Sequence, residues 1–380
     1  MKPWSLLLMV AAMSPGFSQE EGGFHVFTDK KGKTISAKIL SVDDSRRMAE
    51  IEREDGRTFS IEITTFSLED QQFLRDWLGL SSRARPGGSE PVVKGNLRVF
   101  GSLRKGAEIG TGPSDEFDDI IGVEASGNGW IALRENGEVL SFSGRDAGMS
   151  EVRSVGSNTG WLAYLKEDGT VWTSSQSQAF PGELENVTQV AAGSGHIIAV
   201  MEDGTAKVWG SRYKDASDGP VDPPLPLEGV VDVATCQDKV AAVDSEGVVH
   251  CWTMPKRGEE LKSSEIEVYS HRLGDGVVAV EGSIFHFLAL TASGEVYEWA
   301  SGDPSQAVKP DEGPSGAATA IRANGSTRAA RLEDGSWVAW GQSGNSGIVE
   351  KIKDLGPVPD IAFFSEPMKD SDAFVVWIEP

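Results

Sequence analysis

The stretch "HIIAVMEDGTAKVWG", residues 196–210, contains two short apolar runs separated by Asp203-Gly204. Asp-Gly between two strand-like runs is a strong hairpin signal, because a type I′ turn needs positive φ at both central positions. We therefore expect an antiparallel hairpin with a type I′ turn. The same pattern recurs along the chain at Asn136-Gly137, Asp168-Gly169, Glu246-Gly247, Ser293-Gly294 and Asp334-Gly335.

An apolar pair of the form V-x-x-V precedes each of these turns. The glycine lies 14 residues after the second member of the pair in all six copies. The position five before the glycine is alanine in five copies, and the position five after it is aromatic in five. Each unit is therefore predicted to form three short strands. The pairs are Ile120/Val123, Val152/Val155, Val187/Val190, Val230/Val233, Val277/Val280 and Ala318/Ile321.

Repeated units of this size favour one architecture. A sheet of three or four short strands cannot bury both of its faces alone, whereas sheets arranged around an axis cover one another. Residues 358–364 and 373–379 supply a further first and second strand, and "GNLRVFG", residues 95–101, matches the missing third. We predict an all-β chain in which residues 95–380 form a seven-bladed β-propeller. Pairing of residues 95–103 with 373–379 is expected to close it.

The repeat resembles that of the regulator of chromosome condensation family. The most similar copies are "VTQVAAGSGHIIAVMEDGTAKVWG" (187–210) and "VVAVEGSIFHFLALTASGEVYEWA" (277–300), and the likeness covers most of residues 95–380. The family's histidine is present as His196 and His286, and we expect each ring to bond a backbone group inside its blade. The founding member of the family is a nucleotide exchange factor that binds chromatin, and a secreted relative inhibits β-lactamases.

The N-terminus has the form of a secretory signal peptide. Lys2 is followed by an apolar run that is too short to span a bilayer, and small residues precede Gln19. We predict that residues 1–18 are cleaved and that the mature protein is secreted or periplasmic. No later segment has the length and apolarity of a membrane span, so we expect no membrane insertion.

Residues 24–78 are predicted to form a separate small domain. Alternating runs around Gly32-Lys33 and Asp55-Gly56 indicate a meander of strands, and Ser67 is a candidate N-cap for a short helix. The segment resembles the Sla-type homology domain 1 of endocytic adaptors, which implies a small SH3-like β-barrel and, in those adaptors, binding of short peptide motifs. Residues 79–94 are rich in Gly, Ser and Pro and are expected to be a linker.

Charge and composition exclude several functions. With 35 basic and 58 acidic residues the formal net charge is −23, which repels nucleic acid. The five histidines have no metal-ligand spacing, and no nucleophile elbow or phosphate loop is present, so we expect no catalytic residue, metal or cofactor. Cys236 and Cys251 fall on strands that are not adjacent, which predicts two free thiols.

These features favour a non-enzymatic scaffold that binds a protein or glycan partner outside the cytoplasm, in an oligomeric state that the sequence does not indicate. Loops on a rigid scaffold commonly carry recognition. The loops between first and second strands contain aromatic residues and an arginine, the usual anchors of protein interfaces. The candidate anchors are Trp130, Trp161, Phe285 and Arg328, although both tryptophans could instead pack inside blades.

Two alternatives remain open. One is a propeller hydrolase or lyase that uses carboxylates near the central channel, and the other is a secreted enzyme inhibitor. A deep channel pocket with converging carboxylates would favour the enzyme, and a shallow rim of exposed aromatic side chains would favour binding.

Overall fold

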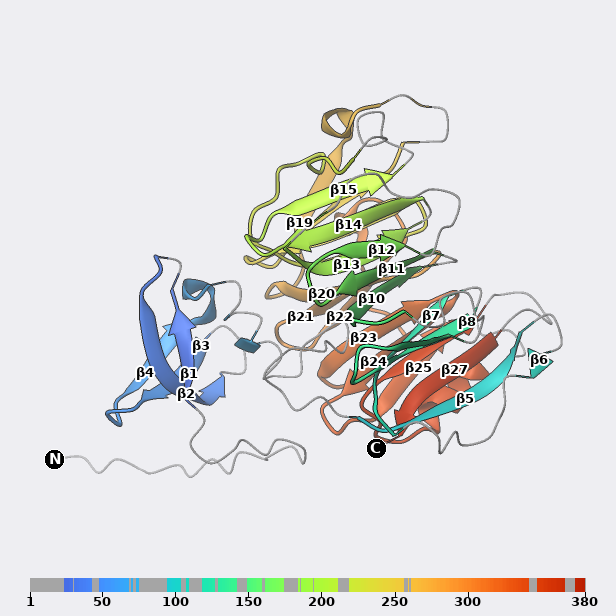
Figure 1. Ribbon diagram of the computed structural model, residues 1–380, viewed down its shortest axis with the longest axis horizontal. Coiled ribbons are helices and arrows are strands. Elements are labelled where there is room, and N and C mark those ends of the chain that lie inside the picture. Colours follow the sequence, from blue (N-terminus) through green and yellow to red (C-terminus); the bar gives the residue numbers. More distant parts are fainter. Residues whose placement is uncertain are drawn as a thin grey trace.

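In the computed structural model the described secondary structure is mainly antiparallel strands (Figure 1). The signal segment, most of the linker and Phe142 lie outside the described residues. The structure describes residues 24–29, 31–42, 48–67, 70, 73–74, 94–103, 107–108, 118–126, 129–141, 149–158, 161–173, 184, 186–193, 195–210, 219–255, 259, 261–341, 347–365 and 373–379.

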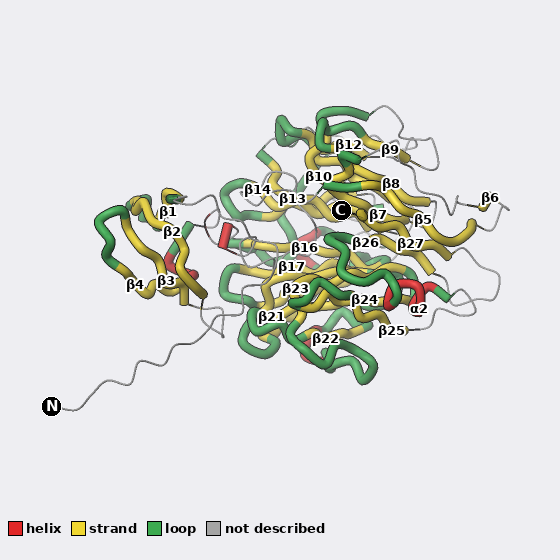
Figure 2. The backbone as a smooth tube through the Cα atoms, turned by 90° about the horizontal axis from the view of Figure 1, so that it is seen from below, coloured by secondary structure: helices red, strands yellow, loops and turns green. Residues whose placement is uncertain are grey.

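An N-terminal sheet stands apart from the other sheets in both views (Figures 1 and 2). It is a meander of β1 (His25–Thr28), β2 (Thr34–Val42), β3 (Met48–Arg53) and β4 (Thr58–Glu62), followed by η1 (Ile63–Thr65). A bridge between Asp29 and Phe66 returns the chain to the β1 side. The described strands form a sheet in the order β1-β2-β3-β4, and the SH3-like barrel stays a prediction.

Asp70 connects the end of this segment to its first strand. Its carboxylate accepts hydrogen bonds from the Thr28 N–H at 2.6 Å and the Ser67 hydroxyl at 2.8 Å, and it pairs with His25 Nε2 at 2.6 Å. The Ser67 Oγ in turn accepts the Asp70 N–H at 3.2 Å, which confirms Ser67 as a helix N-cap. His25 stacks on Phe73 with 3.8 Å between the ring centroids.

Seven further sheets follow within the described residues, each with three or four strands. Their strands are β7 (Ile120–Ser126), β8 (Gly129–Arg134), β9 (Val139–Ser141); β10 (Val152–Asn158), β11 (Trp161–Lys166), β12 (Val171–Thr173); β13 (Val187–Gly193), β14 (His196–Met201), β15 (Ala206–Gly210); β16 (Val230–Cys236), β17 (Lys239–Asp244), β18 (Val248–Thr253), β19 (Val268–Arg272); β20 (Val277–Gly282), β21 (Phe287–Thr291), β22 (Val296–Trp299); β23 (Ala318–Asn324), β24 (Thr327–Leu332), β25 (Trp337–Gly341); and β26 (Ile361–Ser365), β27 (Ala373–Glu379), β5 (Asn96–Leu103), β6 (Ala107–Glu108).

The seven sheets contact one another in sequence and return to the start. First strands pack in the order β7, β10, β13, β16, β20, β23, β26, and β26 packs again on β7. The last sheet joins both ends of this region, because β27 pairs with β5 from Ala373↔Ser102 to Glu379↔Asn96. Figure 2 shows β26 and β27 beside β5 and β7. The predicted pairing of residues 95–103 with 373–379 is confirmed.

Three short helical elements lie in the connections: η2 (Ser263–Glu265) between β18 and β19 of the fourth sheet, and η3 (Pro304–Gln306) and α2 (Ile348–Lys353) between successive sheets. The helix α2 contacts β25 and β27. Its Lys351 ammonium lies 4.8 Å from the centroid of the Trp377 ring and 5.5 Å from that of Phe100, at cation–π distance from both. The helix therefore covers part of the sheet that joins the two ends.

A β-bulge explains the V-x-x-V spacing. Residues three apart point to opposite faces of a regular strand. In six sheets the register shifts directly after the first member of the pair, for example between Val187 and Gln189, so both members face the same side. All twelve side chains of these pairs are buried. The other shifts follow Ile120, Val152, Val230, Val277 and Ala318.

The expected type I′ turns are wrong. At Asp203-Gly204 only Gly204 has positive φ (+78°), and the Met201 carbonyl accepts the Gly204 N–H at 2.9 Å. This is the geometry of a type I turn followed by a left-handed glycine. Asp203 holds the turn instead, because its carboxylate accepts the N–H of Thr205 at 2.9 Å and the hydroxyl of the same residue at 2.6 Å.

The turn glycines also connect neighbouring sheets. The Gly204 carbonyl accepts the Val230 N–H of the next sheet at 2.8 Å, and the Gly247 carbonyl accepts the Val277 N–H at 3.0 Å. Val152, Val187 and Ala318 bond Gly137, Gly169 and Gly294 in the same way. A Cβ on Gly247 would lie 2.7 Å from the Gly276 Cα, so a side chain has no room there. Each of these five glycines thus supplies both the turn and a hydrogen bond between sheets.

The alanine register lies in the core. The alanines five before the turn glycines, and Tyr164 in their place in the second sheet, are all fully buried. The aromatic register is likewise buried at Trp209, Trp252, Trp299 and Trp340, whereas Trp172, two residues before that register in the second unit, is 59% exposed. The alanines are Ala132, Ala199, Ala242, Ala289 and Ala330.

Leucine at this register should overpack the contact between sheets. We expect Ala199→Leu and Ala289→Leu each to lower the free energy of unfolding by about 1–3 kcal/mol. Denaturant unfolding of the two variants against the parent chain measures the change. Neutral behaviour at both positions would contradict the burial of this register.

The two cysteines behave as predicted. Cys236 ends β16 and Cys251 lies on β18, with β17 between them, and both are free and buried. Burial raises the pKa of Cys236 to about 12 and also raises that of Cys251. Both thiols therefore stay protonated and unreactive at neutral pH.

Candidate functional site

The connections between first and second strands lie on one face of the ring, which we call the loop face. In the fifth sheet the Ser283 N–H donates to the His286 carbonyl at 2.8 Å, which places Ile284 and Phe285 at the tip. The Ser283 Oγ accepts the N–H groups of Phe285 at 3.1 Å and His286 at 2.9 Å. This fixed turn presents Phe285 to solvent with 43% of its surface exposed.

The four predicted anchors differ in their exposure to solvent. Phe285 is exposed at a turn tip, whereas Trp130 is half-buried against the core cluster shared by the first and last sheets. Trp161 begins β11, and its side chain lies outside the described part. Arg328 is only 12% exposed. Of the four, Phe285 has the exposure that a binding anchor needs.

Arg328 is held by its own sheet and by the neighbouring one. Its Nε donates to Glu298 Oε2 at 3.0 Å, and its Nη1 donates to the Ser326 carbonyl at 3.0 Å. The same Glu298 oxygen accepts the Trp340 indole N–H at 3.1 Å. Arg328 therefore joins the fifth and sixth sheets at the loop face. Its packing leaves little of the guanidinium available to a partner.

The two family histidines have different environments. His196 is buried at the start of β14, and its ring occupies the space that a Cβ on Gly193 would need. His286 is half-buried, and burial together with the positive charge of Arg328 holds its pKa below the ordinary value. Among the described atoms the buried Nδ1 of His286 has no hydrogen-bond partner. The expected backbone bond is therefore wrong for that nitrogen, because the turn uses Ser283 instead.

Turn residues of the loop face make contacts between separate sheets. Ile284 packs against the core cluster formed by β5, β7, β8, β26 and β27, although it belongs to the fifth sheet. The Asn324 amide donates to the Ala125 carbonyl at 2.7 Å, from the sixth sheet to the first. Cys236 Sγ approaches the Ile284 carbonyl at 3.5 Å. Phe285 therefore follows a residue, Ile284, that contacts the core cluster of the first and last sheets.

A buried charged cluster lies deeper between the sheets. Arg322 of β23 is 8% exposed and donates to Asp360 Oδ1 at 2.7 Å and to Glu281 Oε1 at 3.3 Å. The Asp360 Oδ1 also accepts the Ile361 N–H at 2.9 Å. Nearby Glu124 accepts the Ser157 hydroxyl at 2.7 Å. The cluster joins the fifth, sixth, seventh and first sheets.

The sequence analysis missed this cluster, although a signal was present. The residue after the second pair member is glycine or alanine in the second, third, fourth and seventh units, at Gly156, Ala191, Ala234 and Ala362. It is charged in the other three, at Glu124, Glu281 and Arg322. Charges of both signs at one otherwise small register indicate buried pairing between neighbouring sheets.

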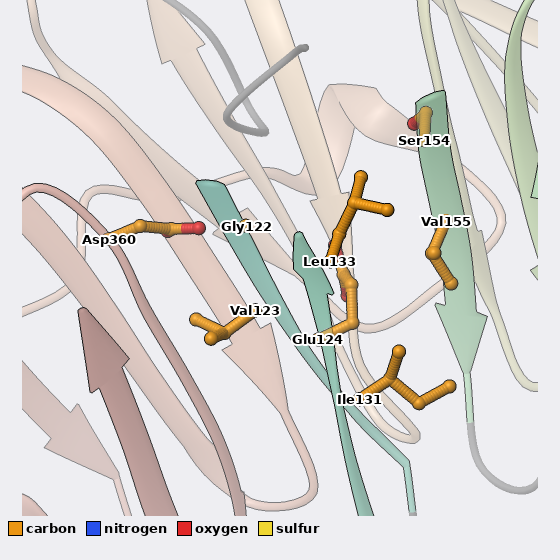
Figure 3. Close-up of a pocket in the computed structure, with 8 residues that line it drawn as sticks. All are labelled: Gly122, Val123, Glu124, Ile131, Leu133, Ser154, Val155 and Asp360. Carbon is orange, nitrogen blue, oxygen red and sulfur yellow. The ribbon is translucent and has the colours of Figure 1, made fainter. Parts of the chain in front are cut away.

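A small pocket opens beside Glu124 and Asp360 (Figure 3). Its lining comes from β7, β8, β10 and Asp360, and includes Ser154 and Leu133. The channel-enzyme alternative named no particular carboxylates, and Glu124 and Asp360 are the two that line this pocket. Asp360 is bonded to Arg322 and Ile361, and Glu124 to Ser157, so both act as structural acceptors. Across the described ranges no group of His, Cys, Asp or Glu side chains has metal-binding geometry.

The two faces of the ring differ in charge. Turns between second and third strands lie at the opposite end of each sheet from the loop face, and we call that end the hairpin face. Its exposed acidic tip residues are Glu135, Glu138, Glu167, Asp168, Glu202, Asp203, Glu246, Glu333 and Asp334, and Asn136 is an exposed neutral one. In the first six units the residues between the first and second strands are Gly127-Asn128, Thr159-Gly160, Ser194-Gly195, Gln237-Asp238, Ser283-Ile284-Phe285-His286 and Gly325-Ser326, a set with one charged residue, Asp238.

Hydrogen bonds keep the hairpin face anionic. The Thr205 hydroxyl and N–H hold the pKa of Asp203 below its ordinary value, and Thr170 and Ser336 do the same for Asp168 and Asp334. In the described part of the chain no helix is long and apolar enough to cross a membrane.

Comparison with known proteins agrees with the repeat pattern. Residues 187–212 match the regulator of chromosome condensation (RCC1) repeat. The chain carries an RCC1 repeat. Regulator of chromosome condensation from Homo sapiens is 26% identical over 192 residues, which cover 50% of this chain and 32% of the relative. The protein of the same name from Mus musculus is 27% identical over 156 residues, 38% of this chain and 33% of the relative. The match spans about a third of these relatives.

Comparison with solved structures shows that the similarity to RCC1 proteins includes the fold. Prp20p from Saccharomyces cerevisiae has a TM-score of 0.55 at 15% identity, covering 82% of this chain and 94% of that chain. Human WBSCR16 has a TM-score of 0.52 at 14% identity, covering 75% and 98%. At this identity the likeness concerns the fold alone. The chain is all-β with an RCC1-type propeller fold.

Proposed function

We propose that this chain is an exported, non-enzymatic seven-bladed propeller that binds a protein partner through its loop face. The seven sheets, the return of β26 to β7 and the β5–β27 pairing support the blade count. The signal-peptide pattern of residues 1–18 supports export. An SH3-like N-terminal barrel is part of the proposal, supported by the β1–β4 meander and the Asp29–Phe66 bridge.

We choose the loop face as the binding surface because the two faces differ in charge. The cores of protein interfaces are depleted in charged residues and enriched in aromatic ones. The loop-face connections of the first six units hold one charge, and Phe285 is exposed among them, whereas every hairpin-face tip in the first three sheets carries exposed acidic residues. A surface with little charge around an exposed aromatic ring can be desolvated at low cost. Phe285 is therefore the proposed anchor, with Arg328 as a support, and Trp130 and Trp161 of the first and second sheets stay candidates on the same face.

The structural relatives favour a protein as the partner. One solved structure is that of Kap60 bound to yeast RCC1 (Prp20), and another report describes the binding of Prp20p to Gsp1p and histones. Those partners belong to those proteins. They support protein binding as a use of the fold, and they favour it over the glycan alternative. A secreted enzyme inhibitor is one form that such binding could take.

The proposal is tested on Phe285. With a partner captured by the mature chain, we expect Phe285→Ala to weaken affinity by about thirtyfold, because removal of a buried aromatic anchor costs about 2 kcal/mol. Trp172→Ala is the matched control, since Trp172 is also exposed but lies on β12 rather than at a turn tip. Equal loss in both variants, or no loss in Phe285→Ala while the protein stays folded, would reject the loop face.

A further inference from the structure

Three polar residues form a hydrogen-bonded chain across the fourth sheet. Asp244 Oδ2 lies 3.0 Å from His250 Nε2, and His250 Nδ1 lies 2.8 Å from Ser270 Oγ. Asp244 ends β17, His250 lies on β18, and Ser270 lies directly opposite it on β19. The residues are thus placed by strand pairing rather than by mobile loops. The sequence analysis considered His250 only as one of five histidines without metal-ligand spacing.

The aspartate is fixed and ionised. Asp244 Oδ1 accepts the N–H groups of Glu246 at 2.9 Å and Val248 at 3.0 Å, as part of the hairpin turn. Burial acts to raise the pKa of Asp244, but the hydrogen bonds from His250 and from these N–H groups outweigh it and lower the pKa. The second oxygen is thereby held toward His250 as an acceptor.

The chain of bonds selects one tautomer of His250. A carboxylate only accepts hydrogen bonds, so Nε2 carries the proton of the neutral ring. The Nδ1 lone pair then faces Ser270, whose hydroxyl must donate to it. This is the relation of base to nucleophile in a serine–histidine–aspartate triad, with the two ring nitrogens exchanged.

Burial separates the base from solvent and leaves the nucleophile accessible. His250 is 9% exposed, whereas Ser270 is exposed on the outermost strand of its sheet. The imidazole is therefore shielded from competing water, and the Ser270 oxygen can be approached by a reagent. Arg272, two residues along the same strand, donates to the Glu246 carbonyl and to the Asp275 carbonyl, which joins β19 to the turn that holds Asp244.

We propose that Ser270 is an activated serine that accepts an acyl group from activated esters. The Ser270 oxygen bonds to the ester carbonyl carbon, and its proton passes to His250 Nδ1. The bond from that carbon to the leaving oxygen breaks, and the leaving group takes the proton from His250 as an alcohol or phenol. Asp244, His250 and Ser270 supply a nucleophile and its base but no oxyanion donor, so we expect slow, single acylation rather than rapid turnover. The inference is independent of partner binding.

The test uses the full mature chain with p-nitrophenyl acetate, followed by peptide mass spectrometry. We expect one acetyl group on Ser270 in the parent chain and none there in Ser270→Ala. Asp244→Asn keeps the Oδ1 acceptor of the turn, but its amide donates to Nε2 and forces the proton onto Nδ1, so acetylation should fall at least about tenfold. Ser264→Ala removes another exposed serine near β19 and should leave acetylation unchanged.

Thermal unfolding is recorded for every variant. Should Asp244→Asn fail to fold, His250→Gln replaces it, because the amide still hydrogen-bonds but is not a base. Acetylation of Ser270 that depends on Asp244 or His250 supports the proposal. Absence of Ser270 acetylation in the parent chain, or equal acetylation in the folded Asp244 or His250 variant, would overturn it and leave the three residues as a structural connection of β19.

Discussion

Deletion of residues 92–104 is expected to open the last sheet and abolish cooperative folding of the propeller region. The deletion removes β5, which pairs with β27 over seven residues and buries Leu97 in the cluster shared with the first sheet. It exposes the edge of β27 and the apolar faces beneath it. We expect a loss of the order of 5 kcal/mol or more, comparable with the whole stability of a typical domain. Calorimetry and denaturant unfolding measure it.

Truncation of residues 1–91 is the matched control. It removes the N-terminal sheet and the linker segment but keeps β5. The propeller region should then unfold with its parent midpoint. An unchanged midpoint in the 92–104 deletion would show that β5 does not close the ring.

Replacement of Arg322 by methionine should be the most damaging single substitution in the ring. Methionine keeps most of the apolar stem, but Glu281 and Asp360 lose their positive partner inside the protein. Breaking a buried ion pair by removing one member costs about 3–5 kcal/mol. Lys207→Met is the control, because the Lys207–Asp222 pair is exposed and such pairs contribute at most about 1 kcal/mol.

The pH dependence of Arg322→Met has a definite sign. Without the guanidinium, burial raises the folded-state pKa of the remaining carboxyls above their unfolded values. Protonation then favours the folded state. The loss in free energy of unfolding, relative to the parent chain, should therefore be largest at neutral pH and become smaller as the pH falls. A deficit that is independent of pH would mean that the loss comes from packing rather than from uncompensated charge.

The repeat could be predicted from the sequence because it depends on local features of the chain. Glycine recurs at the turn of all six copies, and alanine at a crowded register and an aromatic residue further along recur in five of them, each for one physical reason. The closure of the ring could be predicted for the same reason, since residues 95–101 repeat the third-strand pattern. The type I′ turn was wrong because Asp203 bonds Thr205, a detail of side-chain geometry that the Asp-Gly pair alone does not determine.

The candidate site could be predicted only in part, because the exposure and contacts of its residues depend on tertiary structure. Trp130 and Phe285 both belong to the stretch between first and second strands, yet one packs on the core shared by the first and last sheets and the other faces solvent. Arg328 bonds Glu298 of the neighbouring sheet, a contact 30 residues away in sequence. The Arg322 cluster likewise joins residues from separate units, and only the ring arrangement brings them together.

Site-specific photo-crosslinking tests the central claim most directly. One photoreactive residue is placed at position 285 on the loop face and, in a second sample, at position 203 on the hairpin face, and each folded chain is exposed to the same partner. The loop-face account predicts a crosslinked adduct from position 285 and little from position 203. Adducts mainly from position 203, or equal adducts from both, would contradict it.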